Sequence, residues 1–367
     1  MGNSWRAGRP AVCNDVSKDV CENDGLPRKV PCMAVTMNDV ARAAGVSLKT
    51  VSNVLNNYEF IRPATRQKVL EAISELGYEA NLTARSLRSG KSRMLGLVVS
   101  DLSVPYYAEL ASKLMTAAAA RDYRVLVEQS SATRANELSA LHGSLSQLTD
   151  GLLFTPLVLD ADAVAAARRG TKPLVMLGEH VDDPRFDLVT MKNVGAAKAM
   201  TAHLLAGGRR RIAVIGAAPA DRFGSPGLRL AGYREALGEV GVDFDPALIV
   251  PADWRRDGGA SAVGRLLEGG QPFDAVFGLN DALALGALHE LLIRGIRVPE
   301  DAAVAGFDDI DEARFSSPSL TTVAPGMNEI AERSVQLLID RIEGTEKTSG
   351  GVHMEAQFEL RIRASAP

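Results

Sequence analysis

The sequence predicts a small all-α helix-turn-helix headpiece followed by a large α/β core of two doubly wound parallel-sheet subdomains. Its 367 residues exceed what one hydrophobic core usually organises. A segment after residue 34 has the spacing of three short helices, and the remainder alternates short apolar runs with Ala- and Leu-rich helical stretches. We therefore expect a disordered extension over 1–34, the headpiece over 35–80, a hinge helix or linker over 81–93 and the core over 94–367.

Charge is divided unevenly along the chain. Residues 35–93 carry nine Lys and Arg against five Asp and Glu, whereas residues 94–367 carry 27 against 36. The overall net charge of −4 hides this asymmetry. A small basic module joined to an acidic body is typical of a nucleic-acid reader attached to a second function.

The composition disfavours several other classes of protein. The apolar runs fall far short of the roughly 18 to 20 residues that cross a bilayer, so we expect a cytoplasmic protein without membrane contact. The three cysteines lie in the first 32 residues without a zinc-binding spacing, and the five histidines are scattered. We expect no enzyme activity, metal or cofactor. Glu179, His180, Asp182 and Asp183 have metal-ligand chemistry, but their turn-like segment favours a solvated loop.

The headpiece is predicted from VTMNDVARAAGVSLKTVSNVLNN, which begins at residue 35. Thr36 is placed to cap a first helix, Gly45 permits a tight turn, and Ser47 is placed to cap a second helix. Pro63 then opens a third helix, which Gly77 ends. The segment NLTARSLRSGK that follows is either a linker or a two-turn helix, and such a helix would be marginal alone.

Buried strands of two parallel sheets are predicted in the core, with helices on both faces. The expected strands are LGLVVS (95–100), YRVLVEQ (123–129), GLLFTPL (151–157), PLVMLG (173–178), RIAVIGA (211–217), DAVFGL (274–279) and AAVAGFD (302–308). The expected helices include Tyr107–Arg121, Val194–Ala206, Leu228–Val240 and Asp281–Arg294.

Several motifs in a fixed order carry a resemblance to a known family. They are DVARAAGVSLKTVSNVLNN, ARSLRSG, RRIAVIG, LRLAGYREAL, GLNDALALGAL, RVPEDAAVAGFDD and PSLTTV. On these residues the chain resembles the lactose and galactose repressor family of bacterial transcription regulators. The resemblance implies a DNA-reading headpiece, a hinge helix and a dimeric core like the periplasmic sugar-binding proteins. Its two subdomains are expected at roughly 94–192 with a return segment after 323, and at 193–323 with the C-terminal segment.

The second helix of such a headpiece enters the major groove of DNA. Lys49 is then placed to donate to guanine, Asn53 to pair with adenine and Leu48 to touch a thymine methyl group, unless these are merely solvated helix residues. The full expected DNA-binding set is Thr36, Leu48, Lys49, Thr50, Ser52, Asn53, Asn56, Asn81, Ala84, Arg85, Leu87 and Arg88. In the hinge, Leu87 has the chemistry of a minor-groove wedge, or it packs on the core as part of a tether.

The resemblance also implies an effector site in the core, at Tyr106, Tyr107, Trp254, Asn280, Asp281 and Asp308. Aromatic faces that stack on a sugar ring and carboxylates that accept from its hydroxyls suit such a site. Asp281 heads a helix, so a capping role is an equal alternative. Glu179 stands where the family often has an acidic-basic pair, and Gly227 where it often has a ligand-gripping arginine. A missing guanidinium disfavours acidic effectors, and Glu179 adds an acceptor.

These observations together predict a sequence-specific transcriptional regulator, a repressor whose operator affinity is controlled by a small neutral ligand, expected to be a sugar. Its expected partners are double-stranded operator DNA of near-palindromic sequence, the effector and a second copy of the chain. The alternative is a ligand-binding protein of the periplasmic type without a DNA function. That alternative leaves the headpiece unexplained.

Overall fold

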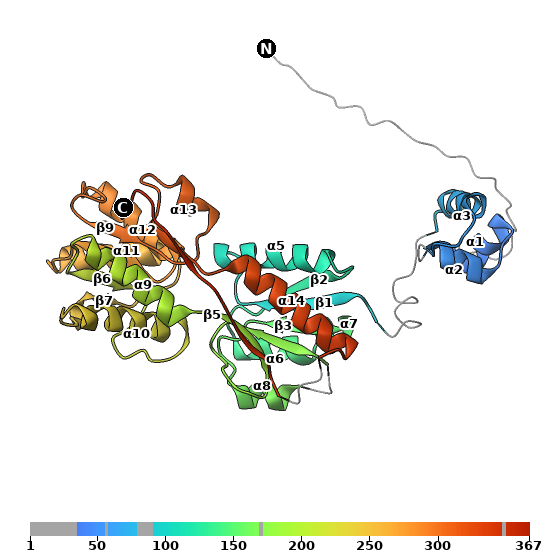
Figure 1. Cartoon of the computed structure of the whole chain (residues 1–367), viewed down its shortest axis with the longest axis horizontal. Helices are drawn as coiled ribbons and strands as arrows, with labels where there is room; N and C mark the ends of the chain where they lie inside the picture. The colour runs from blue at the N-terminus through green and yellow to red at the C-terminus, as the bar shows by residue number, and fades with distance from the viewer. Residues whose placement is uncertain (1–34, 56–57, 79–90, 169–171, 347–349) are drawn as a thin grey trace, which may run out of the picture. The chain divides into compact units, whose positions relative to one another are not determined.

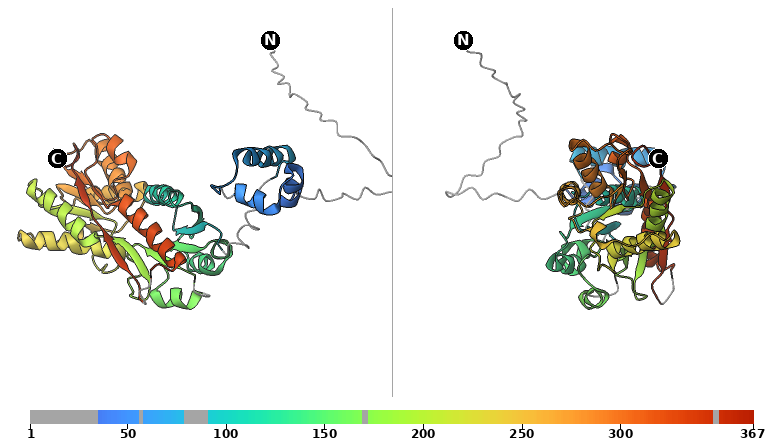
Figure 2. Two further views of the ribbon diagram at one scale, coloured as in Figure 1. Left: turned by 45° about the vertical axis from the view of Figure 1, so that its right-hand side comes forward. Right: turned by 90° about the vertical axis from the view of Figure 1, so that its left-hand side faces the viewer.

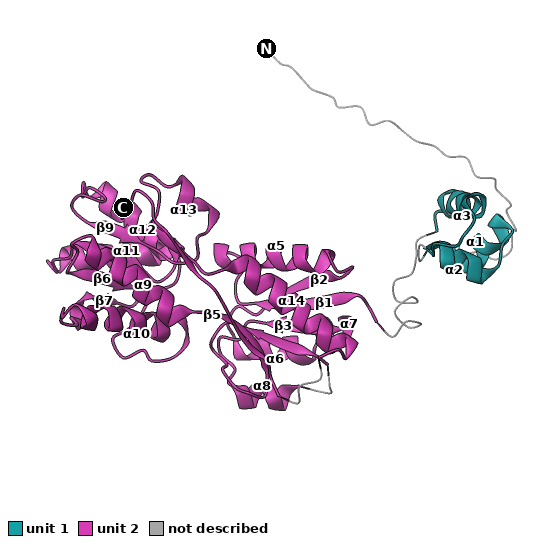
Figure 3. Ribbon diagram, in the orientation of Figure 1, with its two compact units in different colours: residues 1–81 teal, residues 82–367 magenta. Residues whose placement is uncertain are grey.

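The computed structural model describes residues 35–55, 58–78, 91–168, 172–346 and 350–367. The chain divides into two compact units, residues 1–81 and residues 82–367, which Figure 3 colours separately. None of the helices in the described ranges is long and apolar enough to cross a membrane.

The described residues of the first unit form three helices, namely α1 (Met37–Ala44), α2 (Leu48–Leu55) and α3 (Pro63–Leu76). Thr36 caps α1 as predicted: the backbone N–H of Asp39 donates to its hydroxyl at 3.4 Å, and the Asp39 carboxylate accepts from the Thr36 N–H at 3.0 Å. Gly45 and Gly77 end α1 and α3 with left-handed φ angles of 64° and 59°, which glycine adopts without strain. The small core gathers Val40, Val51, Val54 and Val69.

The second unit contains two parallel sheets. The larger has the strand order β11-β5-β4-β3-β1-β2, and we call it and its helices the six-stranded half. Its strands are β1 (Met94–Val99), β2 (Arg124–Gln129), β3 (Gly151–Phe154), β4 (Leu174–Leu177), β5 (Asp187–Met191) and β11 (His353–Ala356), and its helices are α5 (Pro105–Ala119), α6 (Arg134–His142), α7 (Ser144–Leu148), α8 (Ala161–Ala167) and α14 (Met327–Glu343). Helices α5 and α14 lie on one face and α6, α7 and α8 on the other (Figure 1).

The smaller sheet has the order β7-β6-β8-β9, and we call it and its helices the four-stranded half. Its elements are α9 (Asn193–Ala206), β6 (Ile212–Ile215), α10 (Gly224–Glu239), the 3-10 helix η1 (Pro246–Leu248), β7 (Ile249–Val250), α11 (Arg256–Glu268), β8 (Ala275–Gly278), α12 (Asp281–Ile293), β9 (Ala303–Ala305) and α13 (Asp311–Phe315). An antiparallel pair, β10 (Thr322–Ala324) with β12 (Glu359–Arg361), completes it.

The chain passes between the halves after β5, after β10 and after β11, so neither half is a continuous stretch of sequence (Figures 1 and 2). The predicted strands all form, but the strand predicted over 123–129 is only half-buried. The reason is that β2 is the edge of its sheet and has β1 as its one strand neighbour among the described residues. In the four-stranded half, α11 and α12 approach closely through Gly259 and Gly286. A Cβ at Gly286 would lie 1.8 Å from the carbonyl oxygen of Arg256.

Candidate functional site

Helix α2 presents one face to solvent and one to the headpiece core. Val51 and Val54 are buried, whereas Leu48 is 41% exposed and Lys49 is also exposed. Asn53, two positions after Val51, is half-buried. The first turn is fixed by Ser47, whose hydroxyl accepts from the backbone N–H of Thr50 at 3.1 Å. The N-terminal half of α2 therefore offers a long cation and an apolar side chain to a partner.

The other predicted DNA contacts fall into two groups. Ser52 and Thr50 lie half-buried on α2, and Thr36 is exposed with its hydroxyl donating to Asp39 at 2.6 Å. Six predicted residues lie outside the described part of the chain: Asn56, Asn81, Ala84, Arg85, Leu87 and Arg88. These residues remain sequence-based predictions.

The centre of the second unit holds a buried arginine beside a buried carboxylate. Arg229, on α10, is 2% exposed, and its Nη1 lies 3.8 Å from Oδ1 of Asp308, which follows β9. The Arg229 Nε donates to Oδ1 of Asn193 at 2.8 Å. Its guanidinium carbon lies 3.6 Å from the ring centroid of Phe307 and 5.4 Å from that of Trp254. A planar cation thus lies over the Phe307 ring, near the Trp254 ring and next to an acidic oxygen.

A buried arginine lies close to Gly227, which the sequence analysis took as the position of a missing ligand-gripping arginine. The guanidinium is present two residues further on, inside the motif LRLAGYREAL that carries the family resemblance. Gly227 has a separate reason to be glycine, since a Cβ there would lie 2.3 Å from the carbonyl carbon of Arg222. Arg229 is 2% exposed, and its Nε, Nη1 and Nη2 contact Asn193, Leu279 and Met191, so the absence of a ligand-gripping guanidinium at residue 227 stays a prediction.

Two tyrosines from the six-stranded half reach the same place. Tyr106 and Tyr107, in the first turn of α5, contact each other edge to face with ring centroids 5.3 Å apart. Burial raises the pKa of the Tyr106 phenol well above its usual value, and the nearby carboxylates of Asp308 and Glu179 raise it further. The phenol therefore stays protonated near neutral pH and is available as a hydrogen-bond donor. We call Tyr106, Tyr107, Glu179, Arg229, Trp254 and Asp308 the effector cluster, after the role that the sequence analysis expects for all of them but Arg229.

The Asp308 carboxyl of the cluster has a pKa well above its usual value. Burial raises its pKa to about 7, Arg229 opposes the shift, and the carboxylates of Glu179 and Glu109 add to it. Its side chain is 7% exposed. At neutral pH the free protein thus holds this carboxyl close to half ionised. A ligand that donates a hydrogen bond to Asp308 favours the ionised form.

The structure separates the roles of Asn280 and Asp281 at the start of α12. The cap of α12 is Asn280, whose side-chain oxygen accepts from the Leu283 N–H at 2.8 Å, so the capping interpretation of Asp281 is wrong. Asp281 is fully buried and accepts from the Thr322 hydroxyl and, at 3.0 Å, from the Ile310 N–H. The Asn280 amide also donates to the Trp254 carbonyl at 3.3 Å. Both side chains therefore fix neighbouring backbone and side chains: Asn280 those of α12 and Trp254, and Asp281 those of Ile310 and Thr322.

Glu179 and Trp254 complete the cluster from opposite halves. The Glu179 carboxylate accepts from the hydroxyl of Ser225, at the start of α10, and lies 3.5 Å from the Thr190 hydroxyl. The Trp254 indole N–H donates to the Gly216 carbonyl at 2.9 Å, which fixes the ring plane. Within the described ranges no group of three or more His, Cys, Asp and Glu side chains is arranged to hold a metal ion.

Two further contacts join the halves near the cluster. The Arg255 guanidinium pairs with Asp101 and donates to the Ser103 hydroxyl at 3.0 Å. Glu109 on α5 accepts from the Asp311 backbone N–H at 2.9 Å. Polar contacts between the two halves therefore lie next to the effector cluster.

Known families match both units. Residues 36–81 match the family described as bacterial regulatory proteins, lacI family, and residues 201–366 match the periplasmic binding protein-like domain. The HTH-type transcriptional repressor CytR of Escherichia coli (strain K12) is 33% identical over 328 residues, which cover 89% of this chain and 96% of that protein.

Solved structures agree with these matches. A Lac repressor dimer bound to operator and the anti-inducer ONPF is 28% identical with a TM-score of 0.78, over 91% of this chain and 99% of that one. A complex of the transcriptional regulator CelR with cellobiose is 32% identical with a TM-score of 0.67, over 90% of this chain and 99% of that one. A helix-turn-helix headpiece joined to a two-lobed ligand-binding core defines a DNA-binding transcriptional regulator. The chain belongs to the lacI family of bacterial regulatory proteins.

Proposed function

We propose that the protein is a repressor that binds a near-palindromic operator as a dimer and changes its operator affinity when a neutral sugar occupies the effector cluster. The observation that carries the ligand part of this proposal is the buried pair of Arg229 and Asp308, set against the faces of Phe307 and Trp254. A repressor of this kind acts where the chromosome is, in the cytoplasm.

The chemistry of the cluster favours a neutral polyhydroxylated ligand. Asp308 and Glu179 accept from hydroxyl groups, the Tyr106 phenol donates to them, and aromatic faces cover the apolar face of a sugar ring. Two carboxylates against one guanidinium leave the cluster with an excess of negative charge, which disfavours acidic effectors although the arginine is present. The cellobiose complex of the CelR relative supports the choice of sugars as the first ligands to test.

On the DNA side, we propose that α2 reads bases in the major groove, with Lys49 and Asn53 as base-reading residues. The Lac repressor dimer bound to operator supports one half-site per protomer. Substituting either residue by alanine is expected to cost about 1–3 kcal/mol at its cognate base pair and to leave non-specific binding nearly unchanged. Equal loss on all DNA sequences would assign the residue to phosphate contact.

The hinge proposal concerns Leu87, which lies outside the described residues. If two copies of this segment meet in the minor groove, each Leu87 is placed to wedge into a base step. Leu87→Ala should then reduce operator bending, measured by energy transfer between dyes at the operator ends. An unchanged bend would reduce the segment to a passive tether.

The ligand proposal is tested by a thermal-shift screen of neutral mono- and disaccharides, including cellobiose and ribose, against the full chain. A ligand that binds the native state selectively raises its melting temperature. A matched Asp308→Asn variant separates site binding from solvent effects of the sugar. A sugar that stabilises the wild type and the variant equally contradicts the proposed site.

A further inference from the structure

The turn that carries Asp308 has an unusual backbone. Asp308 has a φ of 121° and Asp309 a φ of 53°, both in the left-handed region that residues with a side chain rarely adopt. A conformation of this kind persists only where surrounding contacts fix it. The direction of the Asp308 carboxylate therefore depends on what holds this turn.

Three elements hold the turn. Asp281, from α12, accepts from the Ile310 N–H at 3.0 Å, and the Val323 carbonyl, from β10, accepts from the Asp308 N–H at 2.9 Å. Asp309, between the two anchored positions, is held by Arg363 of the C-terminal segment. The Arg363 Nη2 donates to Asp309 Oδ1 at 2.5 Å, and the two side chains are 15% and 22% exposed.

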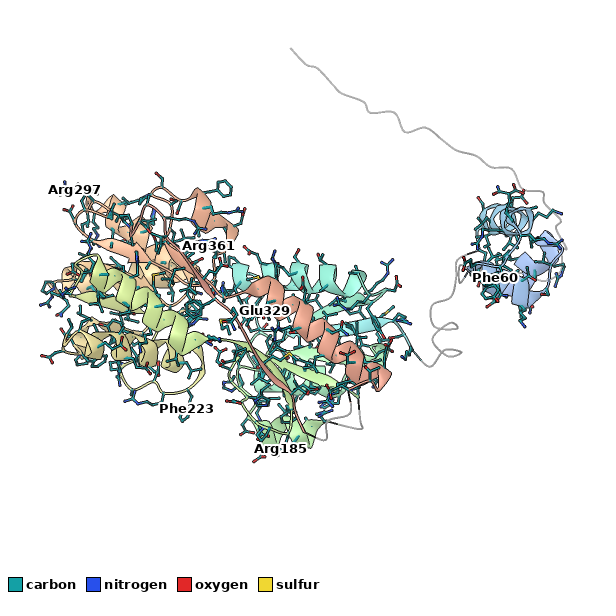
Figure 4. All side chains as sticks on the ribbon, viewed as in Figure 1. Phe60, Arg185, Phe223, Arg297, Glu329 and Arg361 are labelled. Atoms are coloured by element: carbon teal, nitrogen blue, oxygen red, sulfur yellow. The ribbon has the colours of Figure 1, made fainter. Side chains whose placement is uncertain are left out.

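The C-terminal segment is itself fixed against β9 and β10. The Arg363 N–H donates to the Thr321 hydroxyl at 2.8 Å, and its Nη1 donates to the Leu320 carbonyl at 2.8 Å. Two residues later, the Ser365 hydroxyl donates to the Val304 carbonyl in β9 at 2.6 Å. Figure 4 labels Arg361 on this segment, and its Nε lies 3.6 Å from Asp309 Oδ2. The Arg363 guanidinium is thus held at the turn by a hydrogen-bonded segment that follows β12.

We propose that Arg363 is a positioning residue for effector binding: its ion pair with Asp309 holds the left-handed turn that places the Asp308 carboxylate beside Arg229. Arg363 acts through Asp309, and its hydrogen bonds within the described residues go to Asp309, Thr321 and Leu320. This inference rests on the proposed function, because it takes Asp308 as the effector carboxylate. It gives the last residues of the chain a role in ligand affinity.

The test follows the titration of Asp308 through the fluorescence of Trp254. The chain has two tryptophans, so Trp5→Phe leaves Trp254 as the single emitter, 5.4 Å from the guanidinium that pairs with Asp308. Protonation of Asp308 removes the partner charge of Arg229, which changes the field at the indole. The parent protein should titrate near pH 7, and Asp308→Asn should abolish that transition. The charged and titratable groups that face Asp308 stay the same in every other variant: Arg229, Glu179, Glu109, Asp281 and Tyr106.

Two double variants with equal charge isolate the strained turn. Both variants carry Arg363→Gln, which removes the ion pair. The alanine variant adds Asp309→Ala, which leaves a residue that resists a φ of 53° at position 309. The glycine variant adds Asp309→Gly, which adopts that φ without strain. The alanine variant should lose the turn, hydrate Asp308 and lower the titration midpoint by about one pH unit or more. The glycine variant should keep the parent midpoint. Equal midpoints in the two variants overturn the proposal.

A matched control has a buried ion pair far from the turn. Arg341 pairs with Asp187 in the six-stranded half at 2.7 Å, with side chains 17% and 7% exposed. Arg341→Gln should lower the melting temperature without moving the Asp308 midpoint, and an equal shift there contradicts the assigned role of Arg363.

If the alanine variant does not fold, Arg363→Lys answers the same question. It keeps the charge but loses the forked donor geometry. A shifted midpoint supports positioning by Arg363, and an unmoved one overturns it. The titration needs no effector, so failure here refutes the positioning role alone. Failure of every sugar to bind refutes the proposed function instead.

Discussion

Effector affinity should rise with pH around neutrality, because the ligand hydroxyl donates to an ionised Asp308. The folded free protein holds the pKa of this carboxyl at about 7, chiefly through burial. If only the ionised form binds, affinity follows its population, which grows from roughly one tenth at about pH 6 to roughly nine tenths at about pH 8. The dissociation constant should therefore fall about tenfold over that range, which corresponds to about 1.4 kcal/mol.

Isothermal titration calorimetry with a stabilising sugar at three pH values measures this change directly, and buffers of different ionisation enthalpy report the proton released on binding. Asp308→Asn is the control, since its residual binding should not vary with pH. A wild-type dissociation constant that is flat between about pH 6 and 8 would refute the reasoning. The same shift sets how the stability of the free protein depends on pH. Because the folded pKa of Asp308 lies above the unfolded value near 3.8, the contribution of this carboxyl to the free energy of unfolding falls as the pH rises from about 4 to about 7.

Two further predictions concern contacts outside the effector cluster. Arg255→Gln breaks the exposed ion pair with Asp101 between the halves and should speed sugar release by no more than about fivefold, because exposed ion pairs contribute about 0–1 kcal/mol. Stopped-flow measurements of sugar release check this, and rising salt should erase the difference from the wild type. Arg256→Gln is the control: it breaks a pair with Glu312 inside one half and should leave the release rate unchanged. Glu137 is fully buried, and its carboxylate accepts from the backbone N–H groups of residues 157–159. Glu137→Gln should therefore lower the free energy of unfolding, measured in urea, by about 1–3 kcal/mol. An unchanged urea midpoint of unfolding would contradict this.

The parts of the fold that local chemistry specifies were predictable. The capping box of Thr36 and Asp39, the left-handed glycines of the headpiece and the apolar strand runs need only neighbouring residues to be recognised. The short strand β5 (Asp187–Met191) was not predicted. Its residues form neither a continuous apolar run nor a regular alternation of polar and apolar side chains.

The effector cluster was less predictable because its partners are distant in sequence. Arg229 sits in a helix whose pattern gives no sign that a charged side chain is buried, and only the fold brings it to Asp308. Asn280 and Asp281 are adjacent acceptor residues at a helix start, so sequence alone did not decide which one caps. The acceptor role of Glu137 toward a backbone loop likewise has no local signal.

In the proposed mechanism, a sugar bound at the effector cluster controls operator binding by the headpiece. The direct measurement is operator affinity by fluorescence anisotropy, with and without a saturating sugar that stabilises the wild type, in the wild type and in Asp308→Asn. We expect the sugar to change wild-type operator affinity by about 1–3 kcal/mol, the usual size of coupling between two sites. Asp308→Asn should bind the operator normally and should not respond to the sugar. A wild type that binds sugar and operator independently, or an Asp308→Asn protein that responds like the wild type at the same sugar concentration, would contradict it.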